Sequence, residues 1–430
     1  MRTSEVKYTD PSVPRRDPYF DFAKKITDSH ILTDPWIDGD PRFSDEPVIL
    51  GAGTYALMQK AAEHIGALYD ELVRIILREP HWLDDYFHLT PHQKMLWFAS
   101  GGRWHGMARL DMFLCTDGRL QVCEMNSDTP SGEAEAVLIN QIIRSRFLRF
   151  TDPNAGLETQ FIRMVLRLWG KRTWPRLSPT VGIVYPTEMP EDLSMIRLYQ
   201  RWLESRGAHI ILGSPYNLGS TAQRLTLLQK PVDVLIRHYK TDWWCERLPV
   251  WKDQEPFPDA LPLVKPLQHL MRAWLAGQIT MINPPGAVLT QNKLTMAFFW
   301  EHLRKFSPTA RNTIRTWIPE TRRLITKESK KLNKNEWVLK SDYGCEGDEV
   351  IIGNDVSETL WKESLSKAIP KHWILQRYFS SIRIGRENLI PNFGLYLVGG
   401  RAAGIYTRLS NTATDGTALS AATLIDQHSH

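Results

Sequence analysis

The sequence predicts an α+β protein of about two or three domains, and three patterns along its 430 residues support this prediction. Apolar residues spaced three and four apart predict one face of a helix over residues 55–78. Two short runs within residues 109–126 flank Asp117-Gly118, which is a strong local signal of a β-hairpin. Strand, helix and strand patterns follow one another over residues 181–237, which predicts a βαβ unit with a small parallel sheet.

The other elements are expected in chain order. Residues 1–50 hold six prolines and eight aspartates without a clear period, which predicts an irregular N-terminal arm. Residues 133–149 return to helical spacing. Short strands at 337–340 and 349–352 enclose a loop that contains glycines, and a second hairpin turns at Gly399-Gly400.

Composition excludes several classes of protein. Hydrophobic residues make up 42% of the chain and charged residues 23%, which is typical of a globular protein with a sizeable core. No apolar run approaches the roughly 18 residues that predict a membrane span, and the N-terminus lacks the apolar region of a secretory signal. The four cysteines have no CxxC spacing, so a reduced, cytoplasmic compartment is expected.

Positive charge is concentrated in one segment. Residues 301–334 carry ten Lys and Arg against three Glu, a net charge of +7 that leaves −2 for the rest of the chain. Such a segment can bind nucleic acid or polyphosphate. A solvated helix and loop face explains the same composition and is the favoured interpretation.

The first group of candidate functional residues lies in the 109–126 hairpin. Arg109 and Asp111 are two positions apart on one strand, and Glu124 and Asn126 are two apart on the returning strand, so the pairs can meet on one face of the sheet. Carboxylate and amide oxygens of this kind hold Mg²⁺, while an arginine beside them contacts phosphoryl oxygens. Cross-strand salt bridges in a surface hairpin are the alternative.

A second group follows the strand that ends at Lys340. The loop from Gly344 to Gly347 could close its backbone N–H groups on phosphate oxygens, and the lysine could reach the same phosphates. The loop is not a Walker A motif, because no Gly-Lys-Ser/Thr sequence opens a helix there. From the pattern alone, an ordinary hairpin loop is the favoured interpretation. Lys293, at the start of a predicted helix, carries little information alone.

Two further segments are compatible with nucleotide binding. Residues 373–378 (WILQRY) form an apolar strand that runs into polar residues and could present backbone groups to an adenine edge. Arg408 ends the second strand of the Gly399-Gly400 hairpin, where it could face a transferred phosphate or remain in solvent.

The order of these motifs closely resembles the synthetase part of the glutathionylspermidine synthetase family. The specific part is Arg109-x-Asp111 followed by Glu124-x-Asn126-x-Asp128-Thr129-Pro130-Ser131. A βαβ domain, an Asn-Lys helix, a strand lysine with its glycine loop, WILQRY and a terminal Gly-Gly hairpin then follow in the family's order. The resemblance spans roughly residues 55–425.

The resemblance implies an ATP-grasp fold with permuted strand order and an inserted small α/β domain. It divides the chain into an N-terminal arm (1–50), a metal-bearing part of the core (51–150), an α/β substrate domain (151–285), a nucleotide-clamping lobe (286–380) and a C-terminal hairpin that completes the core (381–430).

The resemblance also implies a role for each candidate residue. The metal ligands would be Asp111, Glu124 and Asn126, the catalytic residues Arg109 and Arg408, and the substrate-binding residues Asp128, Thr129 and Ser131. ATP would be bound by Lys293, Lys340, Gly344, Cys345, Glu346, Gly347, Gln376 and Tyr378. Two positions depart from the family pattern, since Ser341 follows Lys340 where proline is usual and Cys345 stands where arginine is frequent.

The expected function is therefore an ATP- and Mg²⁺-dependent ligase that joins a small-molecule or peptide carboxylate to an amine through an acyl phosphate. We expect a monomer or homodimer without a membrane partner. The alternative is a degenerate nucleotide-binding protein that serves a macromolecular partner such as RNA, because the glycine loop is altered and residues 301–334 are basic.

Overall fold

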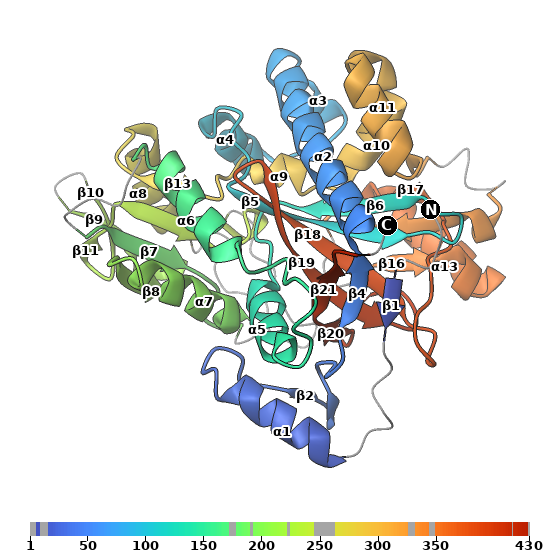
Figure 1. Cartoon of the computed structure of the whole chain (residues 1–430). Helices are drawn as coiled ribbons and strands as arrows, with labels where there is room; N and C mark the ends of the chain where they lie inside the picture. Colours follow the sequence, from blue (N-terminus) through green and yellow to red (C-terminus); the bar gives the residue numbers. More distant parts are fainter. Residues whose placement is uncertain are drawn as a thin grey trace.

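The computed structural model describes residues 6–8, 16–171, 178–189, 192–221, 224–244, 263–325, 332–343, 349–414 and 416–428. These residues form the predicted mixture of helices and sheets (Figure 1). In Figure 1 a central antiparallel sheet lies between a parallel sheet, drawn in green, and a second antiparallel sheet, drawn in orange. The candidate site depends on how these three sheets meet.

The central sheet joins the early and late parts of the chain. Its strand order is β20-β19-β18-β5-β6, so the first predicted hairpin lies directly beside the second. Both hairpins are confirmed. The strands are β5 (Met107–Leu114), β6 (Leu120–Asn126), β18 (Ile390–Val398), β19 (Arg401–Ser410) and β20 (Leu419–Ala421).

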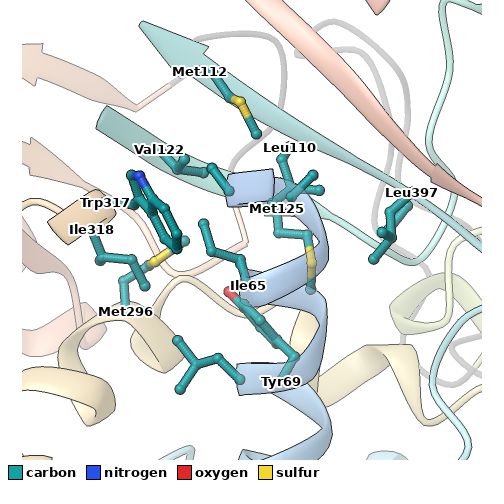
Figure 2. Packing of buried hydrophobic residues seen from close by; sticks show 14 of the residues in the cluster. Ile65, Tyr69, Leu110, Met112, Val122, Met125, Met296, Trp317, Ile318 and Leu397 are labelled. Carbon is teal, nitrogen blue, oxygen red and sulfur yellow. The ribbon is translucent and has the colours of Figure 1, made fainter. Parts of the chain in front are cut away.

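The two faces of the central sheet pack against different helices because side chains alternate along a strand. Phe393, Leu395 and Leu397 of β18 join one hydrophobic core, while Tyr396 and Val398 join another. The first core also contains the apolar face of α2 (Ala52–Arg78), as predicted, together with α10 (Leu294–Glu301) and α11 (Pro308–Trp317). Figure 2 shows Ile65 and Tyr69 of α2 among β5 and β6 side chains. Helices α5 (Glu133–Arg144) and α6 (Leu157–Leu168) contribute to the second core.

The βαβ unit is confirmed as part of a four-stranded parallel sheet with the order β13-β12-β7-β8. The sequence patterns had indicated three of these strands, and the short β13 is the addition. The elements are β7 (Thr180–Val184), α7 (Leu193–Glu204), β8 (His209–Gly213), β12 (Val234–Arg237), α8 (Val264–Leu275) and β13 (Thr280–Ile282), with a small sheet of β9 (Leu218–Thr221), β10 (Arg224–Leu227) and β11 (Lys230–Pro231).

The second antiparallel sheet has the order β14-β17-β15-β16. Its strands are β14 (Thr321–Arg323), β15 (Trp337–Lys340), β16 (Val350–Ile352) and β17 (Ile374–Arg377), and α13 (Glu358–Ala368) covers one face. The strands predicted around the glycine loop and at WILQRY are therefore present. The loop residues Gly344, Cys345, Glu346 and Gly347 lie outside the described residues.

The prediction of an irregular arm over residues 1–50 is wrong in its secondary structure. Helix α1 (Arg16–Thr27) forms and buries Tyr19, Phe22 and Ile26 on one face. Strand β4 (Val48–Gly51) pairs with β1 (Val6–Tyr8) and with β21 (Thr423–Asp426) near the other end of the chain. A strand whose partner is almost 400 residues away leaves no local pattern.

Short elements complete the fold. They are β2 (Trp36–Ile37), β3 (Asp40–Pro41), α3 (Trp82–Asp85), α4 (Pro91–Ala99) and α9 (Ala287–Thr290). Among the described residues, no helix combines the length and the apolar character that crossing a bilayer requires.

Candidate active site

One cleft of about 1,030 Å³ gathers the predicted site residues. Twelve of the sixteen candidates line it, and the other four are the glycine-loop residues outside the described part of the chain. The lining candidates are Arg109, Asp111, Glu124, Asn126, Asp128, Thr129, Ser131, Lys293, Lys340, Gln376, Tyr378 and Arg408. Their roles remain predictions, but the fold brings these residues together from every part of the sequence that carries a motif.

The hairpin β5–β6 sets the register of the charged residues. Arg109 lies opposite Asn126, and Asp111 lies opposite Glu124, as the two-residue spacings predict. The register shifts directly after Asp111, where a bulge begins. Carboxylates that face each other across an antiparallel ladder repel unless cations lie between or beside them.

Asp111 is neutralised by two arginines. Arg109 donates to both carboxylate oxygens, from Nε at 2.8 Å and from Nη2 at 3.2 Å, and Arg408 donates from Nη2 at 2.8 Å. Only 2% of the Asp111 side chain is exposed. Burial disfavours the charged form of Asp111, but Arg109 and Arg408 outweigh it and hold its pKa at about 2. Asp111 is therefore ionised at any ordinary pH.

Arg109 depends on a glycine that the sequence patterns did not indicate. Gly394 pairs with Asp111 in the neighbouring strand, and a β-carbon there would lie 2.7 Å from Cδ of Arg109. The absence of a side chain lets the arginine lie flat across β18. Its Nη1 then donates to the Ser131 carbonyl at 2.9 Å, which ties the arginine to the loop after β6.

Glu124 and Asn126 are the less tightly bound oxygen donors. The Glu124 side chain is 25% exposed, with Oε2 3.5 Å from Nζ of Lys293. Asn126 donates to Oε1 of Glu124 at 3.4 Å and accepts from Gln291 at 3.3 Å. These bonds are long, so the two oxygens can exchange them for a cation. The hard oxygen set fits Mg²⁺, although the described His, Cys, Asp and Glu residues form no group of three that could hold a metal by themselves.

Gln291 is a second residue that the sequence patterns did not indicate. Its side-chain oxygen accepts from the backbone N–H groups of Ser127 and Asp128, while its nitrogen donates to Asn126. It thereby fixes the turn that follows β6 and orients the Asn126 amide. Its position two residues before Lys293 was the only available signal.

Two lysines that are predicted to bind nucleotide line the cleft. Lys340 is buried and donates from Nζ to Oε1 of Gln376 at 2.8 Å, and Lys293 begins α10 as predicted. The Gln376 side-chain amide contacts Lys340, Thr321 and the Cys123 carbonyl, and the position of Gln376 near adenine stays a prediction.

One backbone group of Tyr378 is already hydrogen-bonded within the protein. It lines the cleft, but its backbone N–H donates to the Glu336 carbonyl at 2.8 Å. An adenine edge would therefore have to use its other groups. The pairing of β17 with β15 explains this hydrogen bond, since it brings residues 336 and 378 side by side beyond the last paired strand positions.

The predicted substrate residues divide into two kinds. Thr129 and Ser131 line the cleft in a loop that ends at Gly132, where φ is +95° and a β-carbon would collide with Tyr406. The Asp128 carboxylate, in contrast, is buried and accepts hydrogen bonds from Arg237 and from both the N–H and the hydroxyl of Thr241. Asp128 therefore joins the hairpin to the parallel sheet, and direct substrate contact is a poor fit.

Several cleft residues at the end facing the parallel sheet were not predicted. Arg42 pairs with Glu135 at 3.1 Å, and Nε2 of His238 lies 3.3 Å from Asp192. Lys240 also lines the cleft. These residues come from separate elements, so no spacing along the sequence reveals them.

The basic segment 301–334 is partly neutralised. Lys305 pairs with Glu79 at 2.7 Å and Arg323 with Glu301 at 2.9 Å. The Arg322 guanidinium lies 4.4 Å from the Trp337 ring centre. Lys327, Lys330 and Lys331 lie outside the described residues. These pairs favour the interpretation as a solvated face, and the nucleic-acid hypothesis remains untested.

The fold is similar to that of a solved glutathione synthetase-like protein. The apo form of a glutathione synthetase-like effector from Globodera pallida superimposes with a TM-score of 0.61 at 12% identity, covering 97% of this chain and 98% of that chain. A candidate γ-glutamylcysteine synthetase from Methylobacillus flagellatus KT gives a TM-score of 0.44 at 13% identity, over 83% and 84% of the two chains. No curated protein matches the chain.

The chain belongs to the glutathionylspermidine synthase preATP-grasp family, whose model matches residues 54–425. This match confirms the resemblance that the order of the motifs indicated. It leaves residues 1–53, including α1 and β4, outside the family match.

Proposed function

We propose that the protein is an ATP- and Mg²⁺-dependent ligase that joins a carboxylic acid to an amine through an acyl phosphate. The observation that carries this proposal is the convergence of Arg109, Asp111 and Arg408 with Glu124 and Asn126 in one cleft. Family membership supports the same class of reaction.

The proposed reaction has two steps. A carboxylate oxygen of the acid attacks the γ-phosphorus of ATP, and the bond from that phosphorus to the bridging oxygen of ADP breaks. The amine nitrogen then attacks the acyl carbon, inorganic phosphate leaves and the nitrogen loses a proton, which gives an amide. Both steps require charge neutralisation and alignment more than a protein nucleophile.

Arg109 and Arg408 are the residues suited to the transferred phosphoryl group. Both are held by Asp111, and both guanidinium groups lie 5.9 Å from the Tyr406 ring centre. Fixed guanidinium groups stabilise the charge that spreads over phosphoryl oxygens during transfer, since they need no reorganisation at that moment. Asp111 holds the two arginines close together in spite of their mutual repulsion.

Glu124 and Asn126 are the residues suited to hold Mg²⁺, with Asp111 contributing through an oxygen that it shares with the arginines. When bound, the metal would neutralise phosphate charge. Lys293 and Lys340, which line the same cleft, would contact the phosphates of ATP. Nζ of Lys293 lies 3.5 Å from Oε2 of Glu124, so this lysine is close to the proposed metal site.

The acid and the amine are proposed only as classes. The family name makes glutathione and spermidine the first compounds to test, and other peptide acids and amines should follow. The degenerate, RNA-serving alternative is not favoured, because each described candidate for the chemistry is present and lines the cleft.

The first experiment is titration calorimetry with Mg·ATP and with ATP in EDTA, followed by detection of ADP and of a hydroxamate when hydroxylamine replaces the amine. Magnesium-dependent binding and acid-dependent hydroxamate formation are expected. Binding without any acid-dependent product from a broad panel of peptide acids would contradict the ligase proposal.

A further inference from the structure

Three helices end beside one loop, residues 100–103, on a part of the molecule away from the cleft lining. A β-carbon on Gly102 would lie 2.8 Å from Cδ1 of Leu77, near the end of α2. Nε1 of Trp274, near the end of α8, donates to the carbonyl of the last residue of α4 at 3.0 Å. The Arg103 guanidinium lies 4.2 Å from the centre of the same indole ring. The C-terminal ends of α2, α4 and α8 therefore meet around this loop.

Each of these helices exposes large apolar side chains at this end. Leu77 of α2 is 42% exposed, Met95 and Phe98 of α4 are 46% and 52% exposed, and Leu275 of α8 is 68% exposed. They are four of the eleven large hydrophobic side chains that are exposed in the described part of the chain. Apolar side chains gathered in this way on a surface mark an interaction site.

Arginines surround these apolar side chains. Arg74 and Arg272 lie three positions before Leu77 and Leu275, so each arginine shares a helix face with an exposed leucine. Arginine in the last turn of a helix also stabilises the helix dipole, but that role requires no exposed apolar neighbour. The name helix-end surface is used for the four apolar side chains together with four exposed arginines: Leu77, Met95, Phe98, Leu275, Arg74, Arg78, Arg103 and Arg272.

Acidic residues are scarce around the helix-end surface. The segments that form it, residues 72–78, 91–108 and 263–282, contain no Asp or Glu. Asp70 lies on α2 near this end, and its carboxylate accepts from Nε1 of Trp104 at 2.8 Å. The surface therefore presents a positive charge around an apolar centre.

This combination of charge and apolar area selects among the possible partners. A symmetric contact with a second copy would bring the arginines of both copies together, and they would repel. Nucleic acid has phosphates for the arginines but leaves the aliphatic side chains without a partner. An acidic protein segment matches the charge, but an apolar segment needs a groove, and this surface consists of helix ends and a turn. The interface of an anionic bilayer offers phosphate groups for arginine and acyl chains for Leu, Met and Phe.

We propose that the helix-end surface binds an anionic lipid bilayer, with Phe98 and Leu275 inserted among the acyl chains and the arginines at the lipid phosphates. The expectation of a protein without a membrane partner depended on the absence of a membrane-spanning run, and peripheral binding requires no such run. The proposal does not depend on the proposed ligase function, because no residue of the helix-end surface lines the cleft.

The test is co-sedimentation of the full chain with extruded vesicles. One set contains phosphatidylcholine alone, and the other contains phosphatidylcholine with about 40% phosphatidylglycerol, which gives a negative surface. We expect binding to the anionic vesicles to be about 10-fold stronger or more. Raising the salt concentration from about 0.1 to 0.5 M should weaken this binding, because it screens the arginines.

Three variants test the residues of the surface. Phe98→Ser and Leu275→Ser should each weaken binding to anionic vesicles about 10-fold, because each removes an apolar side chain that the acyl chains would bury. Arg272→Gln should weaken it about 5-fold, because it removes one charge. Leu148→Ser, at a leucine that is 78% exposed outside the surface, and Lys362→Gln on α13 are the matched controls and should bind as wild type does.

Several outcomes would overturn the proposal. These are equal binding to both kinds of vesicle, no binding to either, or binding that all three variants leave unchanged. Binding of poly-L-glutamate or double-stranded RNA, weakened by the same variants in a protein that ignores vesicles, would assign the surface to an acidic macromolecule. Sedimentation equilibrium that shows a dimer disrupted by Leu275→Ser would assign it to a second copy. Mg·ATP binding in the same samples tests the ligase proposal separately and should be unchanged in all variants.

Discussion

The two ends of the cleft differ in how their residues reach it. At the end proposed to bind the phosphates, called the phosphate end below, Arg109, Asp111, Glu124 and Asn126 lie on two adjacent strands joined by one tight turn. At the opposite end, Arg42, Glu135, Asp192 and His238 come from a loop after β3, from α5, from the start of α7 and from the end of β12. The comparison teaches that a short hairpin can be interpreted from spacing alone, whereas a site assembled from distant elements cannot.

The largest expected effect lies at the phosphate end. Glu124→Gln removes a charge from the proposed metal site, so we expect ADP release to fall about 100-fold or more. The fold should persist, because Glu124 is partly exposed and its bonds are long. Glu158→Gln, at an exposed pair with Arg206, is the control. Turnover close to wild type at saturating magnesium would remove Glu124 from the metal site.

Asp111→Asn is a poorer probe of the same end. It would leave two arginines near a neutral amide inside the protein, and breaking a buried ion pair costs about 3–5 kcal/mol. Loss of activity in that variant would therefore mix chemistry with stability. The loss of stability follows from the contact between Asp111 and Arg408, which the spacing within the hairpin does not reveal.

The next largest effect is expected at Asn283, whose side chain connects the parallel sheet to the hairpin β5–β6. The Asn283 side chain accepts from the N–H groups of Gly106 and Met107 and donates to the carbonyls of Met107, Ser127 and Asp128. Asn283→Ala should lower the free energy of unfolding by about 2–4 kcal/mol, because several buried backbone groups lose their partner. Urea unfolding measures this change.

The control for Asn283→Ala is Asn335→Ala, whose side chain lies on the surface. A loss below about 0.5 kcal/mol in Asn283→Ala would show that the two ends are joined mainly by other contacts, such as the Arg237–Asp128 pair.

Lys340→Met tests the nucleotide side of the phosphate end. The variant removes a buried cation and should raise the Kd for Mg·ATP about 10-fold or more. Lys362→Met on α13, where the side chain is 71% exposed, controls for charge on the same lobe. If calorimetry gives the same Kd for Lys340→Met and Lys362→Met, the proposed phosphate contact is wrong.

The smallest expected effect concerns the loop between the two ends. Glu133 follows Gly132 at the start of α5, and burial raises its pKa from 4.5 to about 8. No hydrogen bond of normal geometry reaches either oxygen from the described residues, although Tyr199 lies nearby. The folded state therefore holds a proton that the unfolded state releases between pH 4.5 and 8, and stability contributed by this group is lost as pH rises through that window.

The Glu133→Gln variant has a neutral amide that does not ionise in this pH range. Its free energy of unfolding should change less between pH 5 and 8, and at pH 8.5 it should exceed that of wild type by about 1–3 kcal/mol. Chemical denaturation at several pH values measures the difference. If the free energy of unfolding of the two proteins changes with pH in the same way, the pKa of Glu133 is not raised and Glu133 does not contribute to the pH dependence of stability.

Local spacing was sufficient for much of the fold and for one half of the site. The Asp117-Gly118 turn and the two-residue alternation predict that the Arg109/Asp111 and Glu124/Asn126 pairs meet, but the bulge after Asp111 is what places Asp111 opposite Glu124. The helix over 55–78 and the βαβ unit follow from periodicity in the same way. The stripe of Tyr19, Phe22 and Ile26 in α1 was equally available, but the prolines and aspartates around it obscured it.

The tertiary structure alone decided which neighbours these residues meet. Arg408 reaches Asp111 because β18 pairs with β5 across almost 300 residues of chain, and Lys340 is bound by Gln376 because β15 pairs with β17. Asp128 turned toward Arg237, and Arg42 toward Glu135. Backbone dihedral preferences and turn chemistry act over a few residues, so the sequence determines local register. Contacts between distant segments depend on how whole sheets and helices bury their apolar faces, and only the folded chain shows that result.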